Sequence, residues 1–458
     1  MTLIIVLLLL FSYLLIATGH LTGVNKAAIA MFLGTVGWVV YVIWGADFVA
    51  AQHAAEYADF LAGEPSTSKT VKYFIYDELF LKYVGKAASV VMFLLATMSI
   101  IEILNNNGCF DFIATWIRTR NPKRLLWTIT LATFILSATL DNLTTTIVML
   151  VIMHGIVRNR RQRMLIGSAI VLAACCGGSF TVIGDPTGLI LWGDEAVTAT
   201  QFSLWLALPA LVAWVVPTAL INRELPSRLD IEWIMMPYRG DDTRLKPWQR
   251  VMMLLVGLGG LWFVPTFLSL TRLSPFLGAL CVCSVLWVVN EAFNRKLYNA
   301  DQMSQRRVPR IIQYGALQQM LFIMGIMLGM GVVTETGVLA SIGEWIVAYL
   351  GNVWLIGFIS GVLASVVDSF TIAISDISFF QVSADAASAF AQNGLYWKII
   401  AFATAVGGCL LSVGSVCGIT LMQMEHIRLG WYFKSVTPKV LIGFLSGLAV
   451  LYVESLLL

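Results

Sequence analysis

The sequence predicts an all-α membrane protein of about ten transmembrane helices in two inverted repeats, each with a re-entrant hairpin and a broken helix. Two observations lead to this fold class. Of the 458 residues, 59% are hydrophobic and only 12% are charged, whereas a soluble domain carries about 25% charged residues. One glycine-rich passage also occurs twice, which is typical of a transporter built from internal repeats.

The two copies of this passage are related by a constant shift of 230 positions in all four glycines. They read Gly177-Gly178-Ser-Phe-Thr-Val-Ile-Gly184-Asp185-Pro186-Thr-Gly188 and Gly407-Gly408-Cys-Leu-Leu-Ser-Val-Gly414-Ser415-Val-Cys-Gly418. Each copy lies in an apolar stretch, and glycines weaken a helix. We therefore expect backbone breaks at these eight glycines, in broken helices over 164–191 and 395–424.

Single membrane spans are expected where an apolar stretch can cross a core of about 30 Å. In the first half these stretches lie near 3–20, 26–45, 85–104 and 201–221, and in the second near 250–270, 274–293, 312–334 and 438–458. The first repeat should occupy 1–222 and the second 250–458, with a polar cytoplasmic linker over 223–249. The first span lacks a basic leader and a small-residue cleavage site, so we expect it to be retained.

Two apolar stretches are too long for one crossing. At about 1.5 Å per residue, 125–157 would form a helix of about 50 Å and 353–394 one of about 63 Å. Basic clusters lie on both sides of 125–157, and such clusters favour the cytoplasmic side. That stretch should therefore enter and leave by one face, as a hairpin with Asp141 at its tip. Asp368 lies 227 positions later and marks the corresponding tip of the second hairpin.

Basic residues also predict the orientation. If both termini lie outside, 23 of the 29 Lys and Arg residues are cytoplasmic, and 311–397 contains none. This bias supports an N-out, C-out chain in the cell (inner) membrane. Amphipathic stretches at 108–119 and 337–350 recur at an offset of 229. They are expected on the membrane surface, either as arms between a fixed and a moving part or as plain connecting helices.

Polar side chains gather at the two tips and the two breaks. A carboxylate at the bilayer centre costs about 2.5–3.5 kcal/mol, so several together need a reason. The tips and breaks contain no Lys, Arg or His, and we expect no basic residue there to hold an anion. Carboxylate, hydroxyl and unwound carbonyl oxygens would instead bind Na⁺ or Li⁺ in competition with H⁺. The candidate ion-binding residues are Asp141, Asn142, Thr144, Thr145, Ser179, Asp185, Asp368, Ser369, Thr371, Ser412 and Ser415, with Na⁺ expected at Asp141 and Asp368.

Several alternatives stay open at this point. The three aspartates Asp141, Asp185 and Asp368 could simply cap the half-helices that follow them. The roles of Asp376, Glu102 and Glu335 are undecided. The histidines are scattered without metal-ligand spacing. We expect no enzyme activity, no cofactor and no nucleic-acid partner, because a membrane hydrolase would leave the duplicated glycines unexplained.

The motifs resemble those of the ion transporter superfamily, and most closely those of NhaD-type sodium/proton antiporters. The similarity rests on Ser-Ala-Thr-Leu-Asp141-Asn142-Leu-Thr-Thr, on the passage from Gly177 to Thr187, and on Asn105-Asn-Asn-Gly-Cys-Phe110. The resemblance implies inverted repeats, each with a scaffold part and a transport part, in a lipid-embedded homodimer with an elevator-like movement. It also implies exchange of Na⁺ or Li⁺ for H⁺.

The superfamily also contains arsenite exporters and divalent-anion/sodium symporters, so an anion carrier is the alternative. The symporters carry Ser-Asn-Thr at their tips, whereas this chain has Asp141-Asn142 and Asp368-Ser369, which favours cation exchange. The second tip departs from the antiporter pattern Asp-Asn-Val-Pro. The second break carries Ser415 where the first carries Asp185, so ion binding is expected to be unequal in the two halves.

Overall fold

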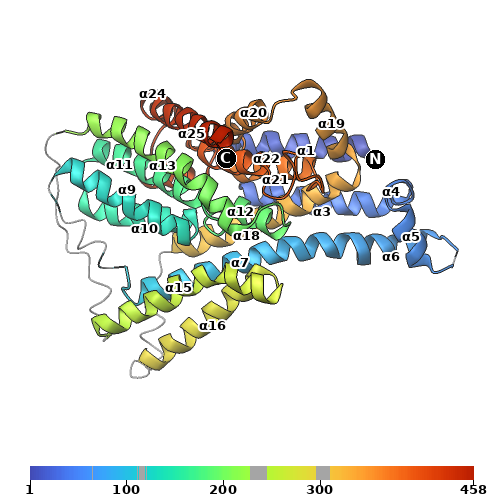
Figure 1. Cartoon of the computed structure of the whole chain (residues 1–458), viewed down its shortest axis with the longest axis horizontal. Coiled ribbons are helices and arrows are strands. Elements are labelled where there is room, and N and C mark those ends of the chain that lie inside the picture. The colour runs from blue at the N-terminus through green and yellow to red at the C-terminus, as the bar shows by residue number, and fades with distance from the viewer. Residues whose placement is uncertain are drawn as a thin grey trace.

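The computed structural model describes residues 1–63, 65–110, 112, 119, 121–226, 245–294 and 310–457. Its regular elements in these ranges are helices, with one isolated bridge between Ser383 and Ala391 (Figure 1). Most of the linker 223–249 and of the amphipathic stretch 108–119 lies outside the described residues. The counterpart at 337–350 is a helix, α19 (Val338–Tyr349).

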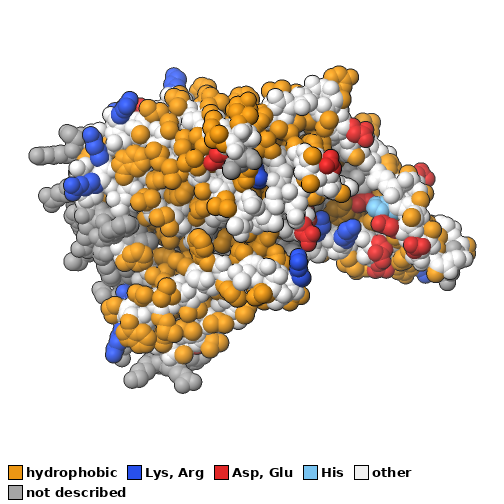
Figure 2. All heavy atoms as spheres, in the orientation of Figure 1, with side chains coloured by type: hydrophobic (Ala, Val, Ile, Leu, Met, Phe, Trp, Pro, Cys, Tyr) orange, Lys and Arg blue, Asp and Glu red, His pale blue; other side chains and the backbone are white. Residues whose placement is uncertain are grey.

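Eight helices in the described ranges are long and apolar enough to cross a membrane. Shorter apolar helices accompany them, including both arms of the second hairpin. In Figure 2 hydrophobic side chains dominate the middle of the visible face, while charged side chains gather mostly toward the two ends of the long axis. The prediction of a helical, multi-pass membrane protein is confirmed.

The two halves repeat one order of elements: two helices, one long helix, a hairpin, a broken helix and a final helix. The first half contains α1 (Thr2–Ala17), α2 (Gly19–Thr22), α3 (Lys26–Trp44), α4 (Ala46–Gln52), α5 (Ala54–Leu61), α6 (Ser68–Phe74), η1 (Ile75–Phe80), α7 (Leu81–Asn106), α9 (Pro122–Thr139), α10 (Asn142–Ile156), α11 (Arg160–Ser179), α12 (Pro186–Gly193) and α13 (Ala199–Glu224). The second contains α15 (Pro247–Thr271), α16 (Pro275–Asn294), α18 (Arg310–Glu335), α19, α20 (Val353–Val366), α21 (Ser369–Phe379), α22 (Leu395–Gly407), α23 (Val416–Glu425), α24 (Leu429–Ser435) and α25 (Thr437–Leu457).

The helices pack as two bundles (Figure 1). In the first, which we call the scaffold bundle, α3 lies along α18, α1 packs against both, and α7 packs against α18. Helices α15 and α16 pack against α7 and against each other. In the second, the hairpin bundle, both hairpins and both broken helices pack with α13 and α25. Helix α18 contacts α10 and α21 and so joins the bundles at the hairpins.

Each hairpin bends at two non-helical residues, the second of which is the aspartate that caps the next helix. The first bends at Leu140 and Asp141, between α9 and α10, and the second at Val367 and Asp368, between α20 and α21. The second hairpin is shorter than the expected 353–394, because helix α21 ends at Phe379 and a loop follows. Polar and turn-forming residues in 380–394 explain this difference.

The repeated glycines allow close backbone contacts in both halves. A Cβ atom on Gly177 would lie 2.3 Å from the carbonyl oxygen of Phe134, and one on Gly407 would lie 2.4 Å from that of Gly361. Phe134 and Gly361 are themselves 227 positions apart. The duplication therefore preserves a packing contact between each hairpin and its broken helix.

The position of the breaks corrects one prediction. The chain leaves the helix over 180–185 and 408–415, so only Gly184, Gly408 and Gly414 lie in non-helical backbone. None of the eight glycines has a positive φ. Close packing, and not an unusual backbone conformation, is what excludes a side chain there. The remaining five lie inside helices: Gly177 and Gly178 in α11, Gly188 in α12, Gly407 in α22 and Gly418 in α23.

Adding one methyl group at these contacts should destabilise the protein. We expect Gly177→Ala and Gly407→Ala each to lower the free energy of unfolding by about 1–3 kcal/mol, as overpacking does. Gly85→Ala is the matched control, because a Cβ at Gly85 in α7 meets nothing within 4 Å. Thermal unfolding of the purified protein in detergent measures the difference. Unchanged melting temperatures for both packed variants would contradict the structural role of the repeat.

Candidate ion-binding site

Four half-helices begin at the tips and breaks, and each starts with a capping side chain from the predicted set. Asp141 Oδ2 accepts from the Thr144 N–H at 2.9 Å in the first hairpin. Asp185 Oδ1 accepts from the Thr187 N–H at 2.9 Å in the first broken helix. These bonds satisfy N–H groups that a helix start leaves unpaired, which matters most where water is scarce.

The second half repeats the arrangement. Asp368 Oδ1 accepts from the Phe370 N–H at 3.0 Å, and Ser415 Oγ accepts from the Gly418 N–H at 3.0 Å. The alternative in which the three aspartates cap helices is therefore confirmed as a structural role. Capping uses only part of each carboxylate, and the oxygens that remain are available for other partners.

Each hairpin tip is tied to its broken helix by the same backbone bond. The Asn142 N–H donates to the carbonyl of Gly184 at 3.3 Å, and the Ser369 N–H donates to the carbonyl of Gly414 at 2.8 Å. In the first half the side chain of Asn142 adds a bond of 2.7 Å from Nδ2 to Asp185 Oδ2. Tip and break are thus joined by hydrogen bonds in each half.

The two units face a common cavity of about 30 Å³. This volume suits a water molecule or a small ion with little or no hydration shell. Helix α18 of the scaffold bundle supplies another part of the wall. The lining residues are Asn142, Cys175, Asp185, Pro186, Gln319, Phe322, Ile323, Asp368, Ser369, Phe370, Ala405, Ser415, Val416 and Cys417.

Five of the predicted residues therefore meet at the cavity: Asn142, Asp185, Asp368, Ser369 and Ser415. The others do not line it. Asp141 is 2% exposed, and its Oδ1 has no hydrogen-bond partner among the described residues; the same holds for Thr145 Oγ1, one turn further on. Hard oxygen atoms that are buried and unpartnered are suited to a cation or a proton.

The remaining predicted side chains make local bonds or none. Thr144 Oγ1 donates to Asp141 Oδ2 at 2.9 Å, and Ser179 Oγ donates to the carbonyl of Cys176 at 2.9 Å. Ser412 Oγ lies 2.9 Å from Met422 Sδ. Ser179 and Ser412 thus do not line the cavity. Thr371 Oγ1 is buried without a partner among the described residues.

The tips and breaks contain no basic residue of their own, but a lysine reaches them from another helix. Lys26, the first residue of α3, places its Nζ 3.2 Å from Asp368 Oδ2 and 3.2 Å from the carbonyl oxygen of Val413 in the second break. Asp368 is fully buried, whereas the Lys26 side chain is 17% exposed. The ammonium belongs to another helix, α3, so the residues of the tips and breaks alone do not predict it.

Comparison with known proteins shows the family of the chain. Residues 1–407 match the family described as citrate transporter, CitMHS. The chain belongs to this family. Sodium/proton antiporter 2 of Arabidopsis thaliana is 32% identical over 80% of the chain and 84% of its own length, and antiporter 1 of the same plant is 31% identical over 80% of the chain and 62% of its own length. The Na⁺/H⁺ antiporter NhaD of Vibrio cholerae is 23% identical over 79% of the chain and 77% of its own length.

The relation to NhaD-type antiporters that the motifs indicated is thereby confirmed. Sequence reasoning nevertheless missed two polar residues of this CitMHS chain, Lys26 and Gln319. The amide of Gln319 lies inside the span expected at 312–334, and a polar side chain at that depth was an available signal. Gln319 is 7% exposed, lines the cavity, and has an Oε1 atom without a partner among the described residues.

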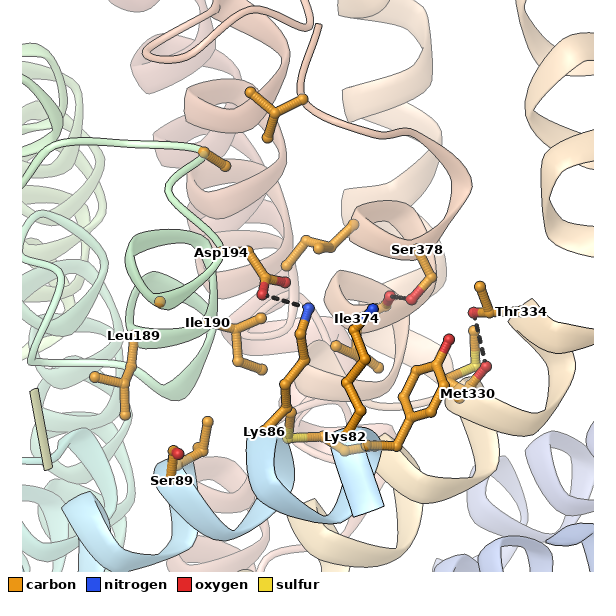
Figure 3. Close-up of a pocket in the computed structure, with 18 of the residues that line it drawn as sticks. Lys82, Lys86, Ser89, Leu189, Ile190, Asp194, Met330, Thr334, Ile374 and Ser378 are labelled. Atoms are coloured by element: carbon orange, nitrogen blue, oxygen red, sulfur yellow. Dashed lines mark hydrogen bonds and ion pairs between the residues drawn. The ribbon is translucent and has the colours of Figure 1, made fainter. Parts of the chain in front are cut away.

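A larger cavity of about 530 Å³ lies between α7, α12, α18 and α21 (Figure 3). Lys82 and Lys86 extend into it from α7, and Lys86 Nζ lies 2.7 Å from Asp194 Oδ1. Ile190 of α12 and Ile374 of α21 also line it. These two helices begin at Asp185 and Asp368, so the large cavity lies further along the helices whose starts form the small one.

Asp376 lies in α21, two turns beyond the tip. It is 5% exposed, and its Oδ2 has no hydrogen-bond partner among the described residues. Its backbone carbonyl accepts from the Tyr396 hydroxyl at 2.9 Å. Asp376 lines neither of the two cavities, so its role stays open.

Away from the cavity, His53 connects the short helices α4 and α5 to the end of α18. Its Nε2 lies 2.7 Å from Glu335 Oε2 and its Nδ1 lies 2.7 Å from Glu56 Oε2. Tyr83 also donates its hydroxyl to Glu335 Oε1 at 2.8 Å. Partial burial lowers the pKa of His53, but the two carboxylates outweigh it, and the pKa is raised above 6.5.

This shift predicts how stability depends on pH. Because the pKa is raised in the folded state, the stabilisation is fully present below pH 6.5 and is lost as the pH rises through the folded value. His53→Gln should therefore lower the melting temperature at pH 6 and have little effect at pH 9, with a maximal cost of about 1 kcal/mol. His426→Asn, at an exposed position, is the control. A deficit of His53→Gln that grew toward alkaline pH would contradict the assignment.

Proposed function

We propose that this protein exchanges Na⁺ or Li⁺ for H⁺ across the membrane by alternating access. The observation that carries the proposal is the cavity of about 30 Å³ between the two halves, with Asp185 and Asp368 in its wall. Its size suits a small cation, and its acidic oxygens supply the ligands. The backbone carbonyls of the breaks add further oxygen atoms, as in other transporters with discontinuous helices.

The electrostatics of the site favour a cation. Four helix N-termini point toward the tips and breaks, and on their own they would attract an anion. Three of the four begin with a carboxylate, which compensates the positive end of its helix and leaves negative charge in the site. A carboxylate that binds either H⁺ or Na⁺, but not both, is sufficient for exchange.

An anion carrier, for dicarboxylate/sodium symport or arsenite export, is the second candidate. The family description, citrate transporter, favours it. A citrate or dicarboxylate molecule is far larger than the cavity, however, and the carboxylates in the wall would repel it. Lys26 does not offer an anion site either, because its ammonium is bound to Asp368. The names of the antiporters from Arabidopsis thaliana and Vibrio cholerae support the cation.

The two bundles supply parts for the movement. Gln319 belongs to the scaffold bundle, while Asp185 and Asp368 belong to the hairpin bundle, so the cavity lies where the bundles meet. Movement of the hairpin bundle against the scaffold bundle would carry the bound ion with it. We further propose a cell-membrane location with both termini outside, for which the charge bias of the sequence is the support. The proposal of a homodimer rests on the resemblance to the ion transporter superfamily.

Neutralising the cap carboxylates tests the exchange reaction directly. Asn caps a helix about as well as Asp, so Asp185→Asn and Asp368→Asn remove the charge while keeping the fold. In liposomes with a pH dye, addition of Na⁺ or Li⁺ should dissipate a preformed pH gradient in the wild type. Each variant should require at least about tenfold more cation, equivalent to about 1.4 kcal/mol of binding free energy. Asp141→Asn should have the same effect.

The control for this assay is Asp385→Asn, in the exposed loop after α21, which should transport like the wild type. Dissipation of the pH gradient by citrate or arsenite, but not by Na⁺ or Li⁺, would show that the protein carries anions and not cations. Wild-type activity in all three site variants, with the protein folded, would show that the ion is bound elsewhere.

The orientation has its own test. A periplasmic reporter, alkaline phosphatase, is fused after Leu458 and expressed in a bacterial host. The fusion should be active, because an N-out, C-out chain exports its C-terminus. A fluorescent protein at the same position should stay dark, since export through the secretory pathway prevents its folding. The opposite pair of results would invert the topology.

A further inference from the structure

The second half of the site already contains a positive charge. Lys26 Nζ lies 3.2 Å from Asp368 Oδ2 and 3.2 Å from the carbonyl oxygen of Val413. A carboxylate oxygen and a carbonyl oxygen of unwound backbone are the same kinds of ligand that Na⁺ takes in discontinuous helices. The ammonium therefore occupies an oxygen set that a transported cation would use.

The ammonium is held loosely for a charged pair. Both of its contacts are longer than the 2.7–2.9 Å or so that is typical of charge-assisted N–H to O bonds. Its side chain keeps 17% of its surface exposed, although Asp368 is fully buried. A long lysine stem with an exposed part can withdraw its head group from the pair.

The first half has no equivalent contact in the part of the chain that the structure describes. Asp141 caps α10 through Oδ2, and its Oδ1 has no hydrogen-bond partner there. The halves thus differ in charge at two places: Asp185 of the first half is replaced by Ser415 in the second, and only the tip of the second half has a lysine contact among the described residues. Among the described residues, Asp368 is paired with a lysine and Asp141 is not.

Lys26 also links the two bundles. It begins α3 in the scaffold bundle, whereas Asp368 and Val413 lie in the hairpin bundle. A bond between them has to break or stretch if the bundles move against each other. The same bond would neutralise Asp368 whenever no transported cation is present.

Resting on the proposed cation exchange, we propose that Lys26 is an internal competitor of the transported cation. Its ammonium occupies Asp368 and the Val413 carbonyl when the site is empty, and Na⁺ binds there by displacing it. The two cations exclude each other because both need the same two oxygens. Lys26 thereby lowers the apparent Na⁺ affinity and keeps the empty carrier from exposing an unpaired buried carboxylate.

The test is Na⁺ binding to the purified full-length protein, measured with ²²Na⁺ in a scintillation proximity assay. Lys26→Gln removes the competitor, so the dissociation constant for Na⁺ should fall at least about threefold, because the fraction of binding-competent protein rises. Lys26→Arg keeps a positive charge and should bind Na⁺ no more tightly than the wild type. Lys439→Gln removes the same charge from the ion pair with Glu224, whose Nζ to Oε1 distance is 2.7 Å, and should leave the constant unchanged.

Other results would overturn the proposal. Na⁺ affinity that is unchanged or weakened in folded Lys26→Gln would mean that the lysine supports the site and does not compete for it. Affinity that rises equally in Lys26→Arg would show that the charge is not the cause. If Lys26→Gln does not fold, Lys26→Met, which keeps the apolar stem, takes its place in the comparison. If neither uncharged variant folds, Lys26→Arg still tests the proposal, because tighter Na⁺ binding by that variant would contradict it.

The result also separates this inference from the proposed function. A wild type that neither binds nor transports Na⁺ or Li⁺ would remove the exchange reaction itself. A wild type that does so, with no gain of affinity in Lys26→Gln, would remove only the role of Lys26.

Discussion

The structure depends on how helix ends are satisfied inside a membrane. A helix that begins at mid-depth exposes unpaired N–H groups in surroundings with little water, and each unsatisfied group is costly. This chain meets that cost at four places with side-chain caps, three of them carboxylates. The groups that allow the helices to start there are thus the groups that give the cavity its charge. Stability and ion binding use the same residues.

The glycine repeat follows from this constraint. A tip and a break can share a hydrogen bond only if hairpin and broken helix approach backbone to backbone, and both halves do so at the same aligned positions. A side chain at Gly184 or Gly414 would separate the two elements, since a Cβ there would lie 2.6 or 2.5 Å from a hairpin carbonyl. The two halves therefore share the geometry of the tip and the break as well as the glycine sequence.

Local patterns were sufficient to predict the helices, both tips and five residues of the cavity wall. Asp141 and Asp368 were found because a carboxylate in an apolar run is rare and because the offset between the halves pairs them. The glycines were found too, although their role was misread, because a glycine that permits close packing looks like one that breaks a helix. The end of the second hairpin at Phe379 was missed because apolar residues continue into the loop.

Lys26 could not be found in this way, and its omission has a physical reason. Positive residues at the end of a span ordinarily mark the membrane surface, and the sequence gives no distance between positions 26 and 368. Only the packing of α3 along α18 brings the start of α3 to the second tip. Asp368 has a lysine partner, whereas Asp141 has none among the described residues, so the two tip carboxylates cannot respond equally to a cation. The asymmetry of this site therefore has two sources. One is visible in the sequence, where Ser415 stands in the place of Asp185. The other arises between helices, because in the part of the chain that the structure describes only the tip at Asp368 has a lysine neighbour.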